Sequence, residues 1–211
     1  MIASVSQLFG GHFWHVVTFA SWAPLFAAVL GVERWRARRA HAAVPRPPRA
    51  SRRRLGGPAA RQLFAIGLVA AATVHLFVMP AHFAQSALYG SFFLGAAALQ
   101  LGGAALVLGR PSRAVIDAAS AACALIVAIW VVSRLVGVPV GPDHGATEPI
   151  GVLDVLATAS ECLALGAGLV ARHDLAPGAR WRLRDWAPGV RVMGASWLAV
   201  TLVAGVLAAK S

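Results

Sequence analysis

The chain has 211 residues, of which 58% are hydrophobic and only 13% are charged, and its net charge is +11. A soluble domain of this size must cover its core with polar side chains, and this composition supplies too few of them. It therefore excludes an ordinary soluble domain and indicates an integral membrane protein in a lipid bilayer. The basic charge does not indicate a nucleic-acid partner, because ten of the nineteen basic residues fall between Arg34 and Arg61 in a stretch without a binding motif.

Six segments are apolar over the roughly 20 residues that a helix needs to cross the hydrocarbon core. We therefore predict an all-α fold, a polytopic bundle of six transmembrane helices that forms one domain over residues 1–211. The first segment lacks the preceding positive charge of a signal peptide, so we expect a retained helix. The six spans are approximately 11–31, 62–80, 86–109, 114–136, 150–171 and 190–209.

The arginines predict how these spans are oriented in the cell membrane. Residues 32–61 form a strongly basic loop, which the positive-inside rule places in the cytoplasm. Residues 137–149 form an acidic loop without Lys or Arg, which we place outside. With six spans, both termini are then extracytoplasmic.

Glycines within the spans predict close contacts between helices, because a residue without a side chain lets two backbones approach. The glycines in question are Gly95, Gly102, Gly103, Gly166 and Gly168.

Ionisable residues inside the spans are informative because each costs roughly 2.5–3.5 kcal/mol at the centre of a bilayer. His75, Met79 and His82 share one helix face at spacings of four and seven residues, and Asp154 and Glu161 are also seven apart. The second and fifth spans run in opposite directions. If they are neighbours, His75 lies level with Glu161 and His82 lies level with Asp154.

Further polar side chains fall at the same predicted outer end, where Arg134 would neutralise Asp154 or Glu148. The spans therefore predict a polar cup that opens to the outside. A proton- or ion-coupled transporter needs polar groups through the full depth of the membrane, so this asymmetry disfavours transport. The additional residues of the cup are His12, His15, His144, Glu148 and Arg134.

The first functional hypothesis is a transition-metal site. Imidazole ligands suit copper, zinc and iron, and a thioether selects Cu(I), so His75, Met79 and His82 point first to copper. Asp154 and Glu161 would ligate the metal, which would favour zinc or iron, or would orient the histidines. Residues of the wider cup would then be additional ligands or would orient ligands.

Three alternatives stay open at this point. One is a b-haem electron-transfer subunit, in which His12 or His15 would face His82 across the macrocycle. Another is a structural or interaction subunit of a membrane complex, or a homo-oligomer, without a cofactor. The third is a hydrolase that uses a metal-activated water.

Two stretches carry a resemblance to a known group. The patterns HLFVMPAHFAQ (75–85) and SRLVGVPVGPDHGATEPIGVLDVLATASE (133–161) resemble a group of multi-pass membrane proteins of actinobacteria. The resemblance implies that His75, His82, Asp154 and Glu161 belong to the group's pattern. Ala81 stands where that pattern has an acidic residue, and the resemblance implies no activity.

Overall fold

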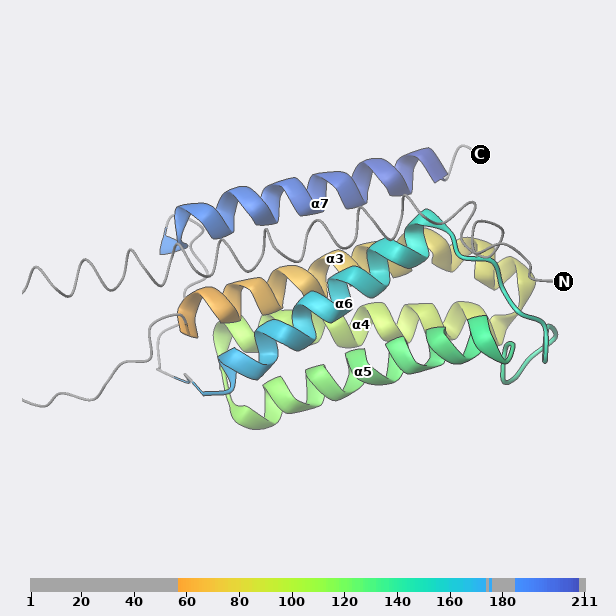
Figure 1. The fold of residues 1–211 in the computed structure, drawn as a ribbon, viewed down its shortest axis with the longest axis horizontal. Helices are drawn as coiled ribbons and strands as arrows, with labels where there is room; N and C mark the ends of the chain where they lie inside the picture. The colour runs from red at the N-terminus through yellow and green to blue at the C-terminus, as the bar shows by residue number, and fades with distance from the viewer. Residues whose placement is uncertain (1–56, 174, 176–184, 209–211) are drawn as a thin grey trace, which may run out of the picture.

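A computed structural model describes residues 57–173, 175 and 185–208 of the chain. The first predicted span, with His12 and His15, lies outside these residues, as does most of the basic loop. The elements of the described part are five α helices, and each is long and apolar enough to cross a membrane. The fold is therefore that of a multi-pass membrane protein (Figure 1). The helices are α3 (Gly57–Gln85), α4 (Ala87–Gly109), α5 (Arg113–Leu135), α6 (Val152–Ala171) and α7 (Pro188–Ala208).

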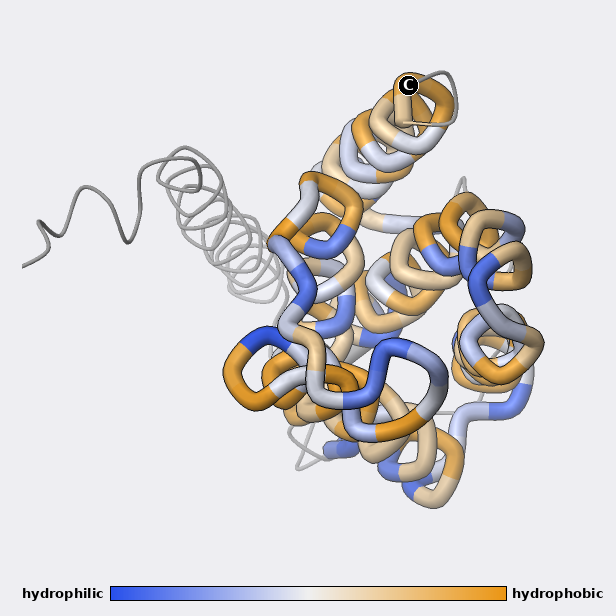
Figure 2. Tube along the Cα trace, turned by 90° about the vertical axis from the view of Figure 1, so that its right-hand side faces the viewer, coloured by the Kyte–Doolittle hydropathy of each residue, from blue (hydrophilic) through white to orange (hydrophobic). Residues whose placement is uncertain are grey.

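Helix α3 is the centre of the assembly. It packs against α4, α6 and α7, while α5 completes a ring by packing against α4 and α6. Helix α7 lies along α3 and α6, outside this ring of four helices. Figure 2 shows the helices from the end that carries the connection between α5 and α6. The arrangement makes α3 and α6 neighbours, as the predicted pairing of their polar residues requires.

Close contact between α3 and α6 depends on Gly67. A Cβ at this position would lie 2.7 Å from the carbonyl oxygen of Ser160 and 2.9 Å from the backbone nitrogen of Ala164. Both atoms belong to the backbone of α6 and cannot rotate away. Any side chain at residue 67 would therefore push the two helices apart.

The predicted role of the other glycines is only partly correct. A Cβ on Gly168 would meet the Ser120 hydroxyl at 2.7 Å, and one on Gly103 would lie 3.2 Å from Ala119. The remaining three have nothing within 4 Å, so they mark no close contact within the described residues; they are Gly95, Gly102 and Gly166.

Helix α3 continues beyond the end predicted for it. We expected the span to end at Pro80, but the helix includes this proline and ends at Gln85. Proline removes one N–H from the helix, and neighbouring helices in a membrane bundle tolerate such a loss. Ser86 then caps α4 directly, because its side chain accepts a hydrogen bond from the N–H of Leu88 at 3.1 Å. As a result, His82 and Gln85 are residues of α3.

Residues 136–151 connect α5 to α6 and fold back onto the bundle; they contain the acidic loop predicted for 137–149, and that name is used below for the whole connection. The Tyr89 hydroxyl of α4 donates to the carbonyl of Val140 at 3.0 Å and accepts from the N–H of Asp143 at 3.2 Å. Gly141 has a φ of 97°, and a Cβ there would collide with the Tyr89 ring. The tyrosine and the glycine together hold the loop against the start of α4.

Candidate functional site

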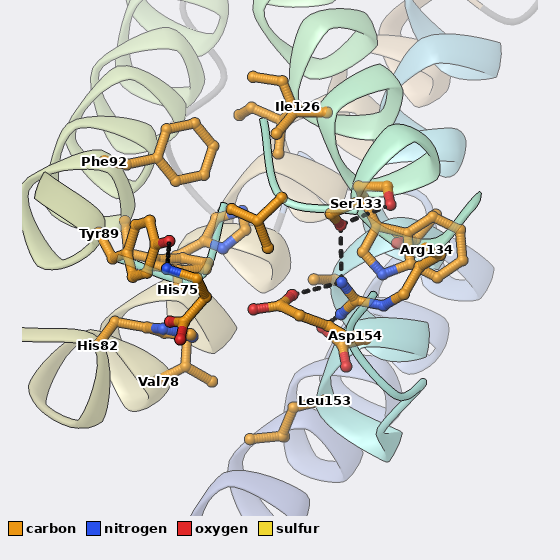
Figure 3. Close-up of a pocket in the computed structure, with 18 of the residues that line it drawn as sticks. His75, Val78, His82, Tyr89, Phe92, Ile126, Ser133, Arg134, Leu153 and Asp154 are labelled. Carbon is orange, nitrogen blue, oxygen red and sulfur yellow. Dashed lines mark hydrogen bonds and ion pairs between the residues drawn. The ribbon is translucent and has the colours of Figure 1, made fainter. Parts of the chain in front are cut away.

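A cavity of about 600 Å³ lies between α3, α4, α5 and α6, beneath the acidic loop (Figure 3). It is formed at the end of the bundle where α3 and α5 finish and where α4 and α6 begin. Six of the predicted site residues line the cavity. Five belong to helices and one to the acidic loop: His75, His82, Arg134, Asp154 and Glu161, and Glu148 of the loop. Its apolar walls include Val74, Phe92, Phe93, Ile126, Ile129 and Trp130.

Glu161 lies at the inner end of this site and is only 1% exposed. Its Oε1 atom is 3.2 Å from Nε2 of His75 on α3, which confirms that these two residues lie at the same level. Gln100 on α4 also donates to Oε1, at 2.8 Å. One carboxylate oxygen thus joins three helices.

His75 is held in one orientation by this contact. An ionised carboxylate can only accept a hydrogen bond, so the ring carries its proton on Nε2 when it is neutral. Its other nitrogen, Nδ1, is buried and has no hydrogen-bond partner within the described part of the chain. The His75 residue as a whole is 4% exposed and lines the cavity. A buried lone pair without a partner is costly, which makes this atom a candidate ligand.

His82 does not pair with Asp154, contrary to the prediction. Its Nδ1 atom lies 2.8 Å from the side-chain oxygen of Gln85, one turn further along α3. Its ring stacks on Phe93 of α4, with 4.1 Å between the ring centroids. Because an amide oxygen is an acceptor, Nδ1 is the donor and the neutral ring keeps its lone pair on Nε2.

Asp154 is instead bound by Arg134, which lies on the opposite wall from His75 and His82 (Figure 3). The guanidinium contacts Asp154 at 2.8 Å and also donates to Glu148 of the acidic loop at 2.5 Å. The sequence predicted one of these two partners, and the structure contains both. Arg134 therefore ties α5 to the acidic loop and to the start of α6. Its side chain is 9% exposed.

Two more polar atoms on cavity-lining residues are buried and unpaired within the described residues. They are Nε1 of Trp130 and Nε of Arg134, one turn apart on α5. The guanidinium carbon of Arg134 lies 5.6 Å from the centre of the Trp130 ring. Both atoms carry a hydrogen and can only donate. Two donors on the α5 side of the cavity therefore lack acceptors among the described residues.

Two other predicted residues lie elsewhere. Met79 is partly buried on α3 and is not among the residues that line the cavity. His144 is exposed on the acidic loop, also outside the cavity lining. Across residues 57–173, 175 and 185–208, no three His, Cys, Asp or Glu side chains come together as a metal-binding group.

Sequence reasoning missed several residues of the site, notably Gln100, Tyr89, Phe93 and Trp130. Gln100 carried a usable signal, because it is a strongly polar amide within an otherwise apolar span and must find a partner there. The three aromatic residues carried none, because aromatic side chains are equally at home in lipid and against a cavity.

No family model, curated protein or solved structure matches the chain, so its function has to be argued from the site itself.

Proposed function

We propose that this multi-pass membrane protein binds a transition-metal ion in the cavity, with Nδ1 of His75 as the anchoring ligand. The observation that carries the proposal is the contact of 3.2 Å between His75 Nε2 and Glu161, together with the buried and unpaired Nδ1. A histidine that binds a metal usually donates its other N–H to a carboxylate, which fixes the ring and strengthens the ligand. His75 already has that arrangement.

His82 supports the same proposal from the same wall. Its contact with Gln85 directs the lone pair to Nε2, so this imidazole is also prepared to bind a metal. Two neutral imidazoles suit copper, which remains the first choice, and zinc or iron are the alternatives. Met79 would join only after its flexible side chain rotated towards the cavity. His12 and His15 of the first predicted span are further candidate ligands.

Haem b is the second candidate, and the size of the cavity favours it. A space of about 600 Å³ with aromatic walls is far larger than one ion needs. Haem with two histidine ligands would need one on each side of the macrocycle, so a second histidine would have to face His82 of α3. Among the predicted residues, His12 or His15 would supply this ligand. A cofactor-free interaction subunit is the remaining reading.

The test is metal analysis by mass spectrometry and an absorption spectrum, both on protein purified in a mild detergent. We expect near-stoichiometric metal in the wild type and loss of that metal in His75→Ala and His82→Ala. The control variants are His41→Ala in the basic loop and His144→Ala on the acidic loop, and both should retain the metal. Size-exclusion chromatography of each variant confirms that it is folded.

Unchanged metal content in both cavity variants would refute the assignment. A Soret band in the wild type would replace the metal ion by haem. If neither metal nor haem is found, even after copper, zinc and iron are added, the polar residues serve to join the helices. The search would then turn to partner subunits.

A further inference from the structure

We propose that the cavity also takes an organic ligand, a neutral aromatic molecule from the bilayer with an oxygen function at each end of its ring, as in a quinol. The ligand is proposed for the metal-free cavity, because it uses the same Nδ1 atom of His75 that would anchor the metal, and the two would compete for that atom. A single water or ion accounts for only about 30 Å³, whereas the cavity measures about 600 Å³. That volume is typical of sites for small organic molecules.

The unpaired polar atoms define what the ligand must offer at each end. On α5, Trp130 Nε1 and Arg134 Nε are donors that lack an acceptor. On α3, Nδ1 of His75 is an acceptor that lacks a donor. Figure 3 shows the labelled side chains of α3 and α5 on opposite walls of the cavity. An oxygen that accepts at the α5 wall and a hydroxyl that donates at the α3 wall would satisfy both.

The charges around the cavity exclude an anion as the preferred ligand. Among the described residues that line the cavity, Arg134 is the one Arg or Lys, and it is already bound to both Glu148 and Asp154. Glu161 adds a further carboxylate at the inner end of the cavity, in contact with His75. A negatively charged ligand would therefore meet net negative charge in a largely apolar setting, where repulsion is poorly screened. A neutral molecule avoids this cost.

The walls indicate that the ligand comes from the membrane. Leu88 and Phe92 of α4 both line the cavity, and they are also 51% and 36% exposed. Both residues thus line the cavity and are also accessible within the described part of the chain. Helix α4 is long and apolar enough to span a membrane, so we infer that a ligand dissolved in the bilayer reaches these side chains. A flat, apolar ring can reach the site from the hydrocarbon layer without crossing the acidic loop.

The experiment is isothermal titration of the detergent-solubilised full chain, treated with a chelator so that metal binding cannot contribute. The three probes share a naphthalene ring: menadiol, kept reduced under anaerobic conditions, methylnaphthalene, which has no oxygen, and naphthoate, which is an anion. Each is titrated into the wild type and into Trp130→Phe, which removes the indole N–H but keeps an aromatic ring. Trp197→Phe is the matched control, because its N–H is bonded to Ser160 and its side chain does not line the cavity.

We expect menadiol to bind more tightly than either other probe. Trp130→Phe should weaken menadiol by roughly three- to tenfold, the value of one hydrogen bond, and should leave methylnaphthalene unchanged. Trp197→Phe should match the wild type. The proposal is overturned if menadiol binds no better than methylnaphthalene, if naphthoate binds best, or if Trp130→Phe has no effect on menadiol. A tightly bound phospholipid that native mass spectrometry finds in the protein, and that menadiol does not displace, would also overturn it. None of these results depends on metal content, so the two proposals fail separately.

Discussion

Replacement of Glu161 tests whether its contacts with His75 and Gln100 hold the bundle together. The two informative variants are Glu161→Gln and Glu161→Leu. Both remove the negative charge, so the cost of burying a carboxylate cancels when the two variants are compared. Glutamine keeps an acceptor oxygen for both donors, whereas leucine keeps only the volume.

The size of the difference follows from the burial of the three side chains. Glu161 and Gln100 are each 1% exposed and His75 is 4% exposed, so water cannot replace the lost acceptor. Glu161→Leu leaves two donors, on His75 and Gln100, without their acceptor. The average value of a polar pair between membrane helices, about 0.6 kcal/mol, gives a lower bound of about 1 kcal/mol for the two contacts. The cost of one fully unpaired buried donor, about 1–3 kcal/mol, sets the upper end. We therefore expect Glu161→Leu to be less stable than Glu161→Gln by about 1–3 kcal/mol. For a protein of this length, each kcal/mol corresponds to about 2–4 °C in the unfolding midpoint.

The chain contains its own reporter for this measurement. Cys123 of α5 is 0% exposed, so a fluorogenic thiol reagent reacts with it only after unfolding. Cys162 is exposed and should be replaced by alanine in every variant, so that it gives no signal from the folded state. Thermal unfolding in detergent then reports the midpoint of each variant. The double variant Glu161→Leu with Gln100→Leu removes one of the two unpaired donors and should regain about half of the loss.

Equal midpoints for Glu161→Gln and Glu161→Leu would show that hydrogen bonding to Oε1 does not stabilise the bundle. Failure of the Gln100→Leu double variant to recover any stability would show that the Gln100 contact in particular carries no energy. Either result would refute the reasoning from burial.

Two further predictions concern helix contacts, and both use the same thermal assay. Gly67→Ala should lower the midpoint by an amount corresponding to about 1–3 kcal/mol, because its Cβ would lie 2.7 Å from the backbone of α6. Gly102→Ala is the control and should leave the midpoint unchanged, because nothing lies within 4 Å of its Cβ. Equal midpoints for the two variants would contradict this prediction. Arg134→Met should lower the free energy of unfolding by about 1–3 kcal/mol, because it leaves the two partly exposed carboxylates of Asp154 and Glu148 unpaired. The triple variant that also carries Asp154→Asn and Glu148→Gln should regain most of this stability. A triple variant as unstable as Arg134→Met alone would show that repulsion between the carboxylates is not the cause.

His12 and His15 lie outside the described residues, and so does the helix predicted for residues 11–31. The orientation of the bundle, with the acidic loop outside, remains a prediction from the arginines. Attachment of membrane-impermeant reagents to single cysteines in the acidic and basic loops would test it directly.

The amino-acid sequence by itself determined that the chain crosses a membrane and where five of its helices run. Long apolar segments have few alternatives in a bilayer, because every backbone polar group must be bonded within the segment. The level pairing of His75 with Glu161 was also predictable. Matched seven-residue spacings on antiparallel helices bring such residues together once the helices are neighbours, and a buried ionisable side chain needs a partner.

The tertiary structure alone decided the rest of the site. The sequence offered Asp154 two partners, Arg134 and His82, and could not show which of them would bind it, because that competition depends on how the helices pack; Arg134 binds Asp154, and His82 contacts Gln85. It also could not show which faces of α4 and α5 point inward. Lipid and protein core are equally apolar, so the apolar pattern of such a helix does not distinguish its two faces. The inward positions of Phe93 and Trp130 therefore follow only from how the helices pack.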